Sequence, residues 1–109
     1  MKFWVIIIPK LCANAMALFP FILLRNKAQK SDFVLLNHEK IHLKQQLELL
    51  IIPFYFLYGI NYLINLLKYK NHYKAYFNIA FEREAYYFEK DPIYLSKRKW
   101  YNWINFYSV

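Results

Sequence analysis

An uncharged stretch of 19 residues, Leu49 to Leu67, constrains the fold of this 109-residue chain more than any other feature. A helix of that length extends about 28 Å, against a hydrocarbon thickness of ~30 Å for a bilayer. Pro53, Asn61 and Asn65 are unfavourable where such a helix faces lipid. The stretch therefore predicts a central apolar helix, which either is inserted or embedded in a membrane or forms the buried core of a water-soluble domain.

The length and composition favour one ordered domain, spanning residues 1–109, with an anionic partner. Hydrophobic residues make up 59% of the sequence and aromatic residues 22%, which excludes a disordered chain. The net charge of +8 makes membrane headgroups and nucleic acid the candidate partners. The C-terminal stretch SKRKWYNWINFY mixes cations with aromatic residues, as headgroup-facing segments do, and no nucleic-acid-binding motif accompanies it. We therefore expect contact with membrane lipid and no nucleic acid, in a membrane-associated or otherwise cytoplasmic protein.

Two extended segments near the N-terminus predict a β-hairpin. Val5 to Ile8 is rich in β-branched residues and ends at Pro9, and LFPFILLR, residues 18–25, is the second extended segment. The first run followed by ANAMA also resembles a short signal peptide, but Pro9 and Lys10 interrupt its apolar part. Cys12 is the only cysteine, which excludes an internal disulfide and a cluster of zinc-binding thiolates.

Helical patterns follow the polar turn NKAQKSD. We expect a helix beginning at Val34, the central apolar helix, a helix over residues 78–89 and a C-terminal amphipathic helix. Together with the hairpin, these elements predict a mainly helical α+β fold with about four helices.

The first of these helices carries the motif NHEKIH. His38, His42 and Gln45 are spaced by four and three residues, so their side chains share one helical face. Two histidines one turn apart reach a common zinc ion, and Glu39 lies beside them, where it serves as a general base. The alternative is a solvated helix that carries two surface histidines.

A catalytic zinc needs a third protein ligand, for which His72 and the downstream acidic residues are candidates. The stretch NIAFEREAYYFE places Glu82, Ala85, Tyr86 and Glu89 on one helical face, whereas Glu84 points elsewhere. A small alanine beside Glu82 allows two helices to approach closely. This spacing predicts Glu82 as the third ligand, and the alternative is a helix with mixed, solvated surface charge.

The sequence HEKIH followed by FEREAY resembles the gluzincin metallopeptidases, in which a His-Glu-x-x-His helix is followed by a Glu-x-x-Ala-Asp or Glu-x-x-Cys-Asp helix. The nearest groups are membrane zinc endopeptidases of the prenyl-protein-processing or heat-shock type and of the β-lactam-sensor type. The resemblance covers residues 34–88 and implies that His38, His42 and Glu82 bind zinc while Glu39 is catalytic. Tyr86 stands where those families have an aspartate, which removes a carboxylate that supports a ligand.

These observations predict a minimal gluzincin-like domain, a membrane-associated zinc metallopeptidase that hydrolyses a peptide or protein substrate. The alternative is a non-catalytic membrane-associated scaffold or interaction protein that retains the fold. The resemblance also implies that the edge of the LFPFILLR strand binds substrate backbone. Gln45 and Gln46 are candidates for orienting a metal ligand. Candidates for stabilising the oxyanion are Tyr86, His72, Tyr94 and Arg98.

Overall fold

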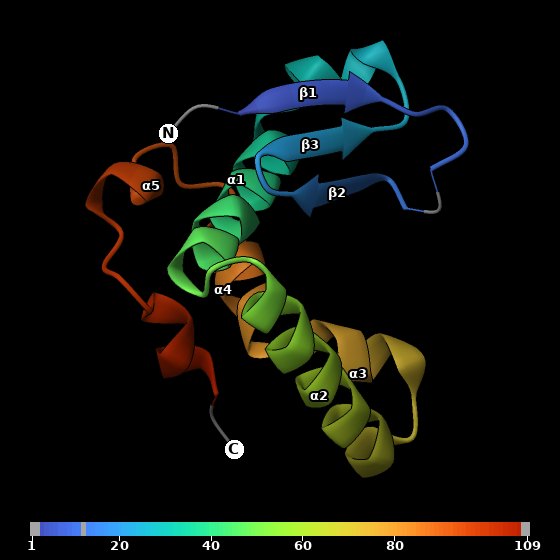
Figure 1. Cartoon of the computed structure of the whole chain (residues 1–109), viewed down its shortest axis with the longest axis vertical. Helices are drawn as coiled ribbons and strands as arrows, with labels where there is room; N and C mark the ends of the chain where they lie inside the picture. The colour runs from blue at the N-terminus through green and yellow to red at the C-terminus, as the bar shows by residue number, and fades with distance from the viewer. Residues whose placement is uncertain (1–2, 12, 108–109) are drawn as a thin grey trace.

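A three-stranded sheet forms the N-terminal part of the fold (Figure 1). The computed structural model describes residues 3–11 and 13–107, so Cys12 lies outside the described residues. The strands are β1 (Trp4–Ile7), β2 (Ala15–Leu18) and β3 (Phe21–Leu24), in the order β1-β3-β2. The N-terminal hairpin consists of β2 and β3, whereas the expected first strand, β1, pairs with β3 in parallel. The LFPFILLR segment therefore supplies the central strand, and the edge strand beside it is β2, which the sequence did not predict.

Helix α1 (Phe33–Glu48) packs against the sheet and carries the histidine motif. It follows a short 3-10 helix, η1 (Lys27–Ser31), and begins where the Asp32 side chain accepts a hydrogen bond from the Leu35 amide at 3.1 Å. Leu43 of α1 joins Ile22 and Leu24 of β3 in a buried cluster. This contact fixes one face of α1 against the sheet and leaves another face for the rest of the chain.

The predicted central helix is α2 (Ile52–Tyr69), which runs away from the sheet. Leu50 and Ile51 both have positive φ, so the chain turns sharply between α1 and α2. Only Phe54 and Asn65 of α2 are buried, which contradicts a fully buried core helix. No single helix among the described residues is long and apolar enough to span a membrane; α1 and α2 pass that test only as a pair bent by 112°.

Two asparagine side chains on one face of α2 form hydrogen bonds with the next two helices in the chain. The Ala80 amide donates to Asn61 Oδ1 at 2.9 Å, and Asn65 Nδ2 donates to the Ala75 carbonyl at 3.1 Å. These bonds fix α3 (His72–Phe77), a short helix that the sequence did not predict, and the start of α4 (Ala80–Phe88). Figure 1 shows the sheet at one end of the molecule and α2 with α3 at the other, with α1 between them.

The prediction of a C-terminal amphipathic helix is wrong. The chain forms only α5 (Tyr94–Lys97) and a 3-10 helix, η2 (Asn102–Phe106). Arg98 between them is extended because its side chain turns inward to buried carboxylates, and Tyr101 has a φ of 59°. Trp103 of η2 is buried against Phe81 of α4. The prediction of a mainly helical α+β fold is nevertheless confirmed.

Candidate metal centre

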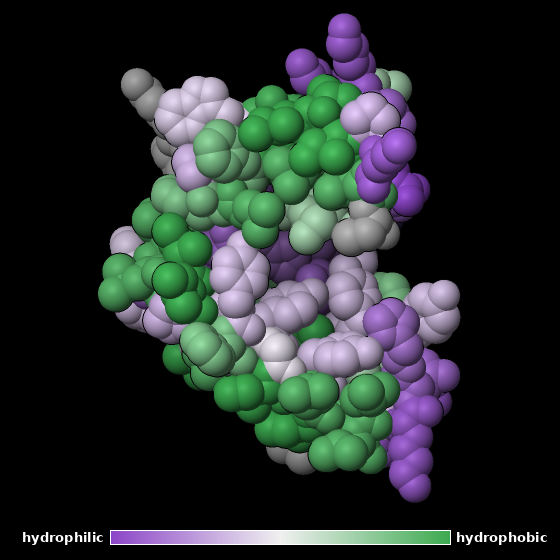
Figure 2. Space-filling view, turned by 45° about the vertical axis from the view of Figure 1, so that its right-hand side comes forward, coloured by the Kyte–Doolittle hydropathy of each residue, from purple (hydrophilic) through white to green (hydrophobic). Residues whose placement is uncertain are grey.

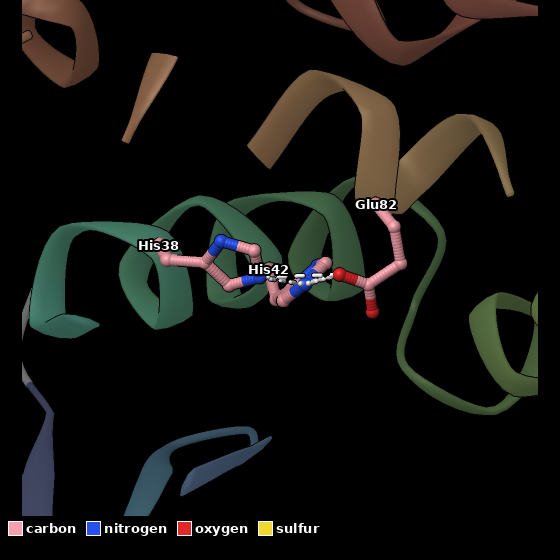
Figure 3. Close-up of side chains that lie close together, drawn as sticks. All are labelled: His38, His42 and Glu82. Atoms are coloured by element: carbon pink, nitrogen blue, oxygen red, sulfur yellow. Dashed lines mark hydrogen bonds and ion pairs between the residues drawn. The ribbon is translucent and has the colours of Figure 1, made fainter. Parts of the chain in front are cut away.

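Helices α1 and α4 bring the three predicted metal ligands together. His38 Nε2 lies 3.1 Å from Glu82 Oε1, and His42 Nε2 lies 3.0 Å from the same oxygen (Figure 3). The two Nε2 atoms are 3.2 Å apart. All three side chains are buried, which contradicts both a solvated helix with surface histidines and a solvated carboxylate at position 82.

The spacing of these three atoms matches a small metal ion. Ligands at 2.0 to 2.1 Å from a tetrahedral zinc lie about 3.3 Å from one another, close to the 3.0 to 3.2 Å observed. Among the described histidine, cysteine, aspartate and glutamate residues, these three form the one group of three or more whose ligand atoms converge in this way. The residues present therefore fit a metal ion with three protein ligands.

The outer nitrogens of both histidines have acceptors. His38 Nδ1 lies 2.9 Å from Glu89 Oε1, and His42 Nδ1 lies 2.7 Å from Gln45 Oε1. A carboxylate only accepts hydrogen bonds, so Glu89 selects the form of His38 that is protonated on Nδ1. In that form the Nε2 lone pair faces the centre of the group, as metal binding requires.

The charges within the group favour a cation at its centre. Burial lowers the pKa of His42, but the adjacent Glu82 carboxylate outweighs burial and raises that pKa to about 9. Burial conversely raises the pKa of Glu82, but the charge of His42 and hydrogen bonds from both histidines hold it well below its ordinary value. Glu82 is therefore ionised at neutral pH. Its negative charge is balanced by the proton on His42, or by a metal ion in place of that proton.

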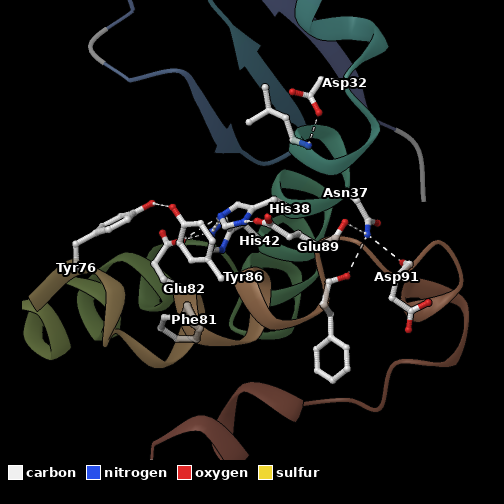
Figure 4. Close-up of polar contacts among 12 residues, drawn as sticks. Asp32, Asn37, His38, His42, Tyr76, Phe81, Glu82, Tyr86, Glu89 and Asp91 are labelled. Atoms are coloured by element: carbon white, nitrogen blue, oxygen red, sulfur yellow. Dashed lines mark hydrogen bonds and ion pairs between the residues drawn. The ribbon is translucent and has the colours of Figure 1, made fainter. Parts of the chain in front are cut away.

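Glu89 provides His38 with a carboxylate partner, whereas position 86 holds Tyr86 in place of the aspartate that the resemblance to gluzincins implies. Glu89 lies seven residues after Glu82, on the face already predicted for this helix, and reaches His38 from just past the end of α4 (Figure 4). Tyr86 packs its ring edge-on against His38, with centroids 4.4 Å apart, and its hydroxyl lies 3.2 Å from that of Tyr76. The departure at position 86 thus leaves His38 with carboxylate support.

Glu39 lies beside His38, His42 and Glu82, the candidate metal-binding group, and faces a pocket of about 340 Å³. Within the described part of the chain its carboxylate has no hydrogen-bonding partner, although the residue is only 7% exposed. Burial raises the pKa of Glu39, and the charges of His42 and His38 oppose that rise. This carboxylate is therefore available to take up a proton inside the pocket.

The pocket lies between β2 and α2. Figure 2 shows a hollow on this face, hydrophilic in its depth, with apolar surface above and below it. Its floor holds the metal-binding group, and Phe54 and Tyr55 of α2 line one side. The Tyr58 hydroxyl donates to Glu82 Oε2 at 2.5 Å, which leaves Glu82 Oε1 for the histidines. The strand beside the pocket is β2, not the LFPFILLR strand expected from the sequence.

Gln45 and Gln46 have different partners. Gln45 bonds to His42, as expected for a residue that orients a ligand. Gln46 instead fixes the β2–β3 hairpin, because its Oε1 accepts from the Phe19 amide and its Nε2 donates to the Ala17 carbonyl, both at 2.7 Å. Gln46 thereby holds the edge strand over the pocket.

The remaining candidates lie outside the pocket. His72 is exposed on α3, and its Nδ1 lies 2.8 Å from the Tyr62 hydroxyl. Tyr94 and Arg98 both bond to Glu84, on the far side of Gln45. Tyr76 does line the pocket, although the sequence did not single it out, because its helix α3 was not predicted.

Asn37 is a second residue that sequence reasoning missed. Its amide Nδ2 lies 2.8 to 3.3 Å from the carbonyl oxygens of Phe88, Glu89 and Asp91, at the end of α4 (Figure 4). These bonds supply a donor to the Glu89 carbonyl and a second donor to the Phe88 and Asp91 carbonyls, which also accept from backbone amides. Asn37 therefore holds Glu89 next to His38.

No family model matches this chain, and neither a curated protein nor a solved structure matches it. The gluzincin resemblance thus rests on the two motifs and on the geometry that joins them.

Proposed function

We propose that this protein is a minimal, gluzincin-like zinc metallopeptidase that hydrolyses peptide bonds. The observation that carries the proposal is the juxtaposition of three converging ligand atoms with the unpartnered Glu39 carboxylate in one pocket. Catalytic zinc sites have three protein ligands, whereas structural sites have four. A structural metal site also has no need of a carboxylate such as Glu39, which faces the pocket and makes no hydrogen bond among the described residues.

Each residue of the pocket has a role in this reaction. His38, His42 and Glu82 would hold the zinc ion, which would supply Lewis-acid chemistry towards the peptide carbonyl and the attacking water. Glu39 accepts the proton of the attacking water and delivers it to the nitrogen of the leaving amine. Its raised pKa suits both steps, because a carboxylate with a pKa nearer neutrality takes up a proton more readily.

The donor for the developing oxyanion is Tyr76 in this proposal. Its hydroxyl lines the pocket and shares one hydrogen bond with the hydroxyl of Tyr86. Burial and the nearby Glu82 raise the pKa of Tyr76, so the phenol keeps its proton and donates it as a hydrogen bond. Tyr58 is already committed to Glu82 and therefore supports the ligand instead.

The decisive experiment compares Glu39→Gln with wild type. One zinc per chain should bind to both proteins, since Glu39 is not a ligand. A mixed peptide library should be cleaved by the zinc-loaded wild type, and the variant should lose about 10²- to 10⁴-fold in rate. Asp91→Asn is the matched control, because it removes a carboxylate outside the pocket.

The opposite result would favour the scaffold alternative. In that case neither protein cleaves any peptide with zinc present or chelated, in detergent or in vesicles. Glu39→Gln then leaves partner binding and stability unchanged, within the roughly 0.5 kcal/mol usual for neutral substitutions.

We also propose that the protein associates with membrane lipid through α2. Exposed apolar side chains follow the outer face of this helix: Ile52, Phe56, Ile60, Leu63, Ile64 and Leu67. Of the C-terminal residues expected at the headgroups, the side chains of Arg98 and Trp103 are buried. The exposed ones among them are Lys97, Lys99, Trp100, Tyr101, Ile104 and Tyr107. This stretch therefore adds to the proposed lipid contact of α2.

The test is flotation with vesicles that contain anionic lipid. The protein should float with them and remain bound in high salt, because burial of apolar surface does not respond to ionic screening. A monodisperse protein that stays behind without detergent would overturn the proposal.

A further inference from the structure

Arg98 lies in a buried ion-pair network behind the metal-binding group. Its guanidinium donates to Glu48 Oε2 at 2.7 Å and Oε1 at 3.0 Å, and to Glu84 Oε2 at 2.5 Å and Oε1 at 3.1 Å. Both carboxylate side chains are at most 3% exposed. The positive charge comes from the segment after α5, while the two carboxylates come from α1 and α4.

The two oxygens of Glu84 have different partners. Oε2 accepts from the Tyr94 hydroxyl, at 2.5 Å, as well as from Arg98. Oε1 accepts from Gln45 Nε2 at 2.9 Å as well as from Arg98 at 3.1 Å, so only the Tyr94 and Gln45 bonds distinguish the two oxygens. Glu84 therefore connects the C-terminal segment with a residue that contacts His42.

These contacts fix the orientation of the Gln45 amide. Its Nε2 donates one hydrogen to Glu84 and the other to the Phe81 carbonyl, at 3.0 Å. Both acceptors lack hydrogens of their own, so the amide nitrogen has to face them. The amide oxygen then faces His42 Nδ1, at 2.7 Å, and accepts a hydrogen bond from it, so that a metal ion would take the place of the proton on Nε2.

We propose that Arg98 and Glu84 are positioning residues that, through Gln45, orient His42 for metal binding. This inference rests on the proposed metal site. It makes the C-terminal segment part of the site, although none of its residues lines the pocket. The Nδ1 atom of His38 bonds to Glu89, outside this network, so the connection from Glu84 through Gln45 acts on His42 only.

Glu84→Gln tests the inference because its amide has only one oxygen. That oxygen prefers the Oε2 position, where Tyr94 and Arg98 both donate at 2.5 Å, over the Oε1 position, where the two bonds are longer, at 2.9 and 3.1 Å. The new amide nitrogen then faces Gln45 Nε2, two donors oppose each other, and Gln45 turns or withdraws from His42. Glu48→Gln is the matched control, since it removes the other carboxylate of the same buried network and leaves the Glu84–Gln45 contact in place.

The measurement is zinc affinity by competition with a chelating dye. Glu84→Gln should bind zinc about 10- to 100-fold more weakly than wild type, the usual effect of losing a partner of a metal ligand. Glu48→Gln should stay within a few-fold of wild type. In the zinc-loaded protein the His42 Nδ1 proton should give a slowly exchanging resonance in wild type and Glu48→Gln, and should exchange rapidly in Glu84→Gln.

Gln45→Met provides a second route if Glu84→Gln does not fold. It keeps the side-chain volume and removes the acceptor from His42 directly, so it should weaken zinc binding to the same extent. In the double variant Gln45→Met/Glu84→Gln the two losses should not add, because they break one connection. Equal losses in Glu84→Gln and Glu48→Gln, or no loss in Gln45→Met, would overturn the inference. Wild-type protein that binds no zinc would instead overturn the proposed function.

Discussion

Helices α1 and α2 follow one another in the chain and differ in what they bury. Helix α1 buries polar side chains, among them Asn37, Gln45 and Glu48, whereas α2 exposes most of its apolar ones. Every buried polar residue of α1 except Glu39 has a hydrogen-bonding partner among the described residues. Burial of polar side chains on α1 therefore follows the availability of a partner, whereas Trp103 Nε1 of η2 is buried without one in the described part of the chain.

Glu39 on α1 and the exposed apolar side chains on α2 are both unfavourable in the protein without a ligand. Burial of the Glu39 carboxylate beside the pocket costs free energy because it disfavours the charged form, and a row of apolar side chains in water also costs free energy. Both are retained where a ligand is expected: a reacting proton at Glu39, and lipid along α2. Each prediction below tests one side of this contrast.

The largest effect should come from Glu82, which carries the charge at the centre of the buried group. Glu82→Gln removes that charge but keeps the volume, and zinc affinity should fall by more than the 10- to 100-fold typical of residues that support a ligand. The loss should exceed that of Glu84→Gln, as measured by the same dye competition. If the two variants lose the same affinity, or only Glu84→Gln loses it, Glu82 is not a ligand.

A smaller effect should come from Asn37, which tests whether partners stabilise the polar face of α1. Asn37→Ala removes the hydrogen bond to the Glu89 carbonyl, while the Phe88 and Asp91 carbonyls keep their bonds from backbone amides, so the free energy of unfolding should fall by about 1 to 3 kcal/mol. Urea denaturation measures this change. Asn105→Ala is the control, since Asn105 bonds only to Asn102 at the surface and should change stability by less than about 0.5 kcal/mol. If the two variants lose the same free energy of unfolding, the hydrogen bonds of Asn37 contribute no more to stability than a surface hydrogen bond does.

The sequence predicted the convergence of His38, His42 and Glu82 because helical spacing places the ligand atoms of each helix on one face. His38 and His42 are one turn apart, and Glu82 and Glu89 are two turns apart, so both pairs face one side whatever the rest of the chain does. The mainly helical α+β class followed from the same periodicities. The supporting role of Glu89 was visible in its spacing but was not assigned.

The parts that the sequence did not predict depend on contacts between distant segments. Leu50 and Ile51 adopt left-handed backbone conformations that their side chains do not favour, so nothing local indicates the sharp turn before α2. Arg98 stands in a basic, aromatic stretch that suggests an exposed helix, yet two buried carboxylates from α1 and α4 draw it inward. The parallel pairing of β1 with β3 likewise involves residues far apart in sequence.

The smallest effect on stability should come from the exposed face of α2. Leu63 and Leu67 are 58% and 79% exposed, and glutamine has nearly the helix propensity of leucine. Leu63→Gln/Leu67→Gln should therefore change the free energy of unfolding by no more than about 0.5 kcal/mol per site in detergent-free buffer. Flotation with vesicles should fall markedly in the same variant, since each buried leucine contributes about 1.5 to 3 kcal/mol to transfer out of water. Ile93→Gln, at an exposed isoleucine outside α2, should leave flotation unchanged. If the double variant unfolds easily and floats as well as wild type, this face packs against protein, and the contrast between the two helices does not reflect a lipid surface.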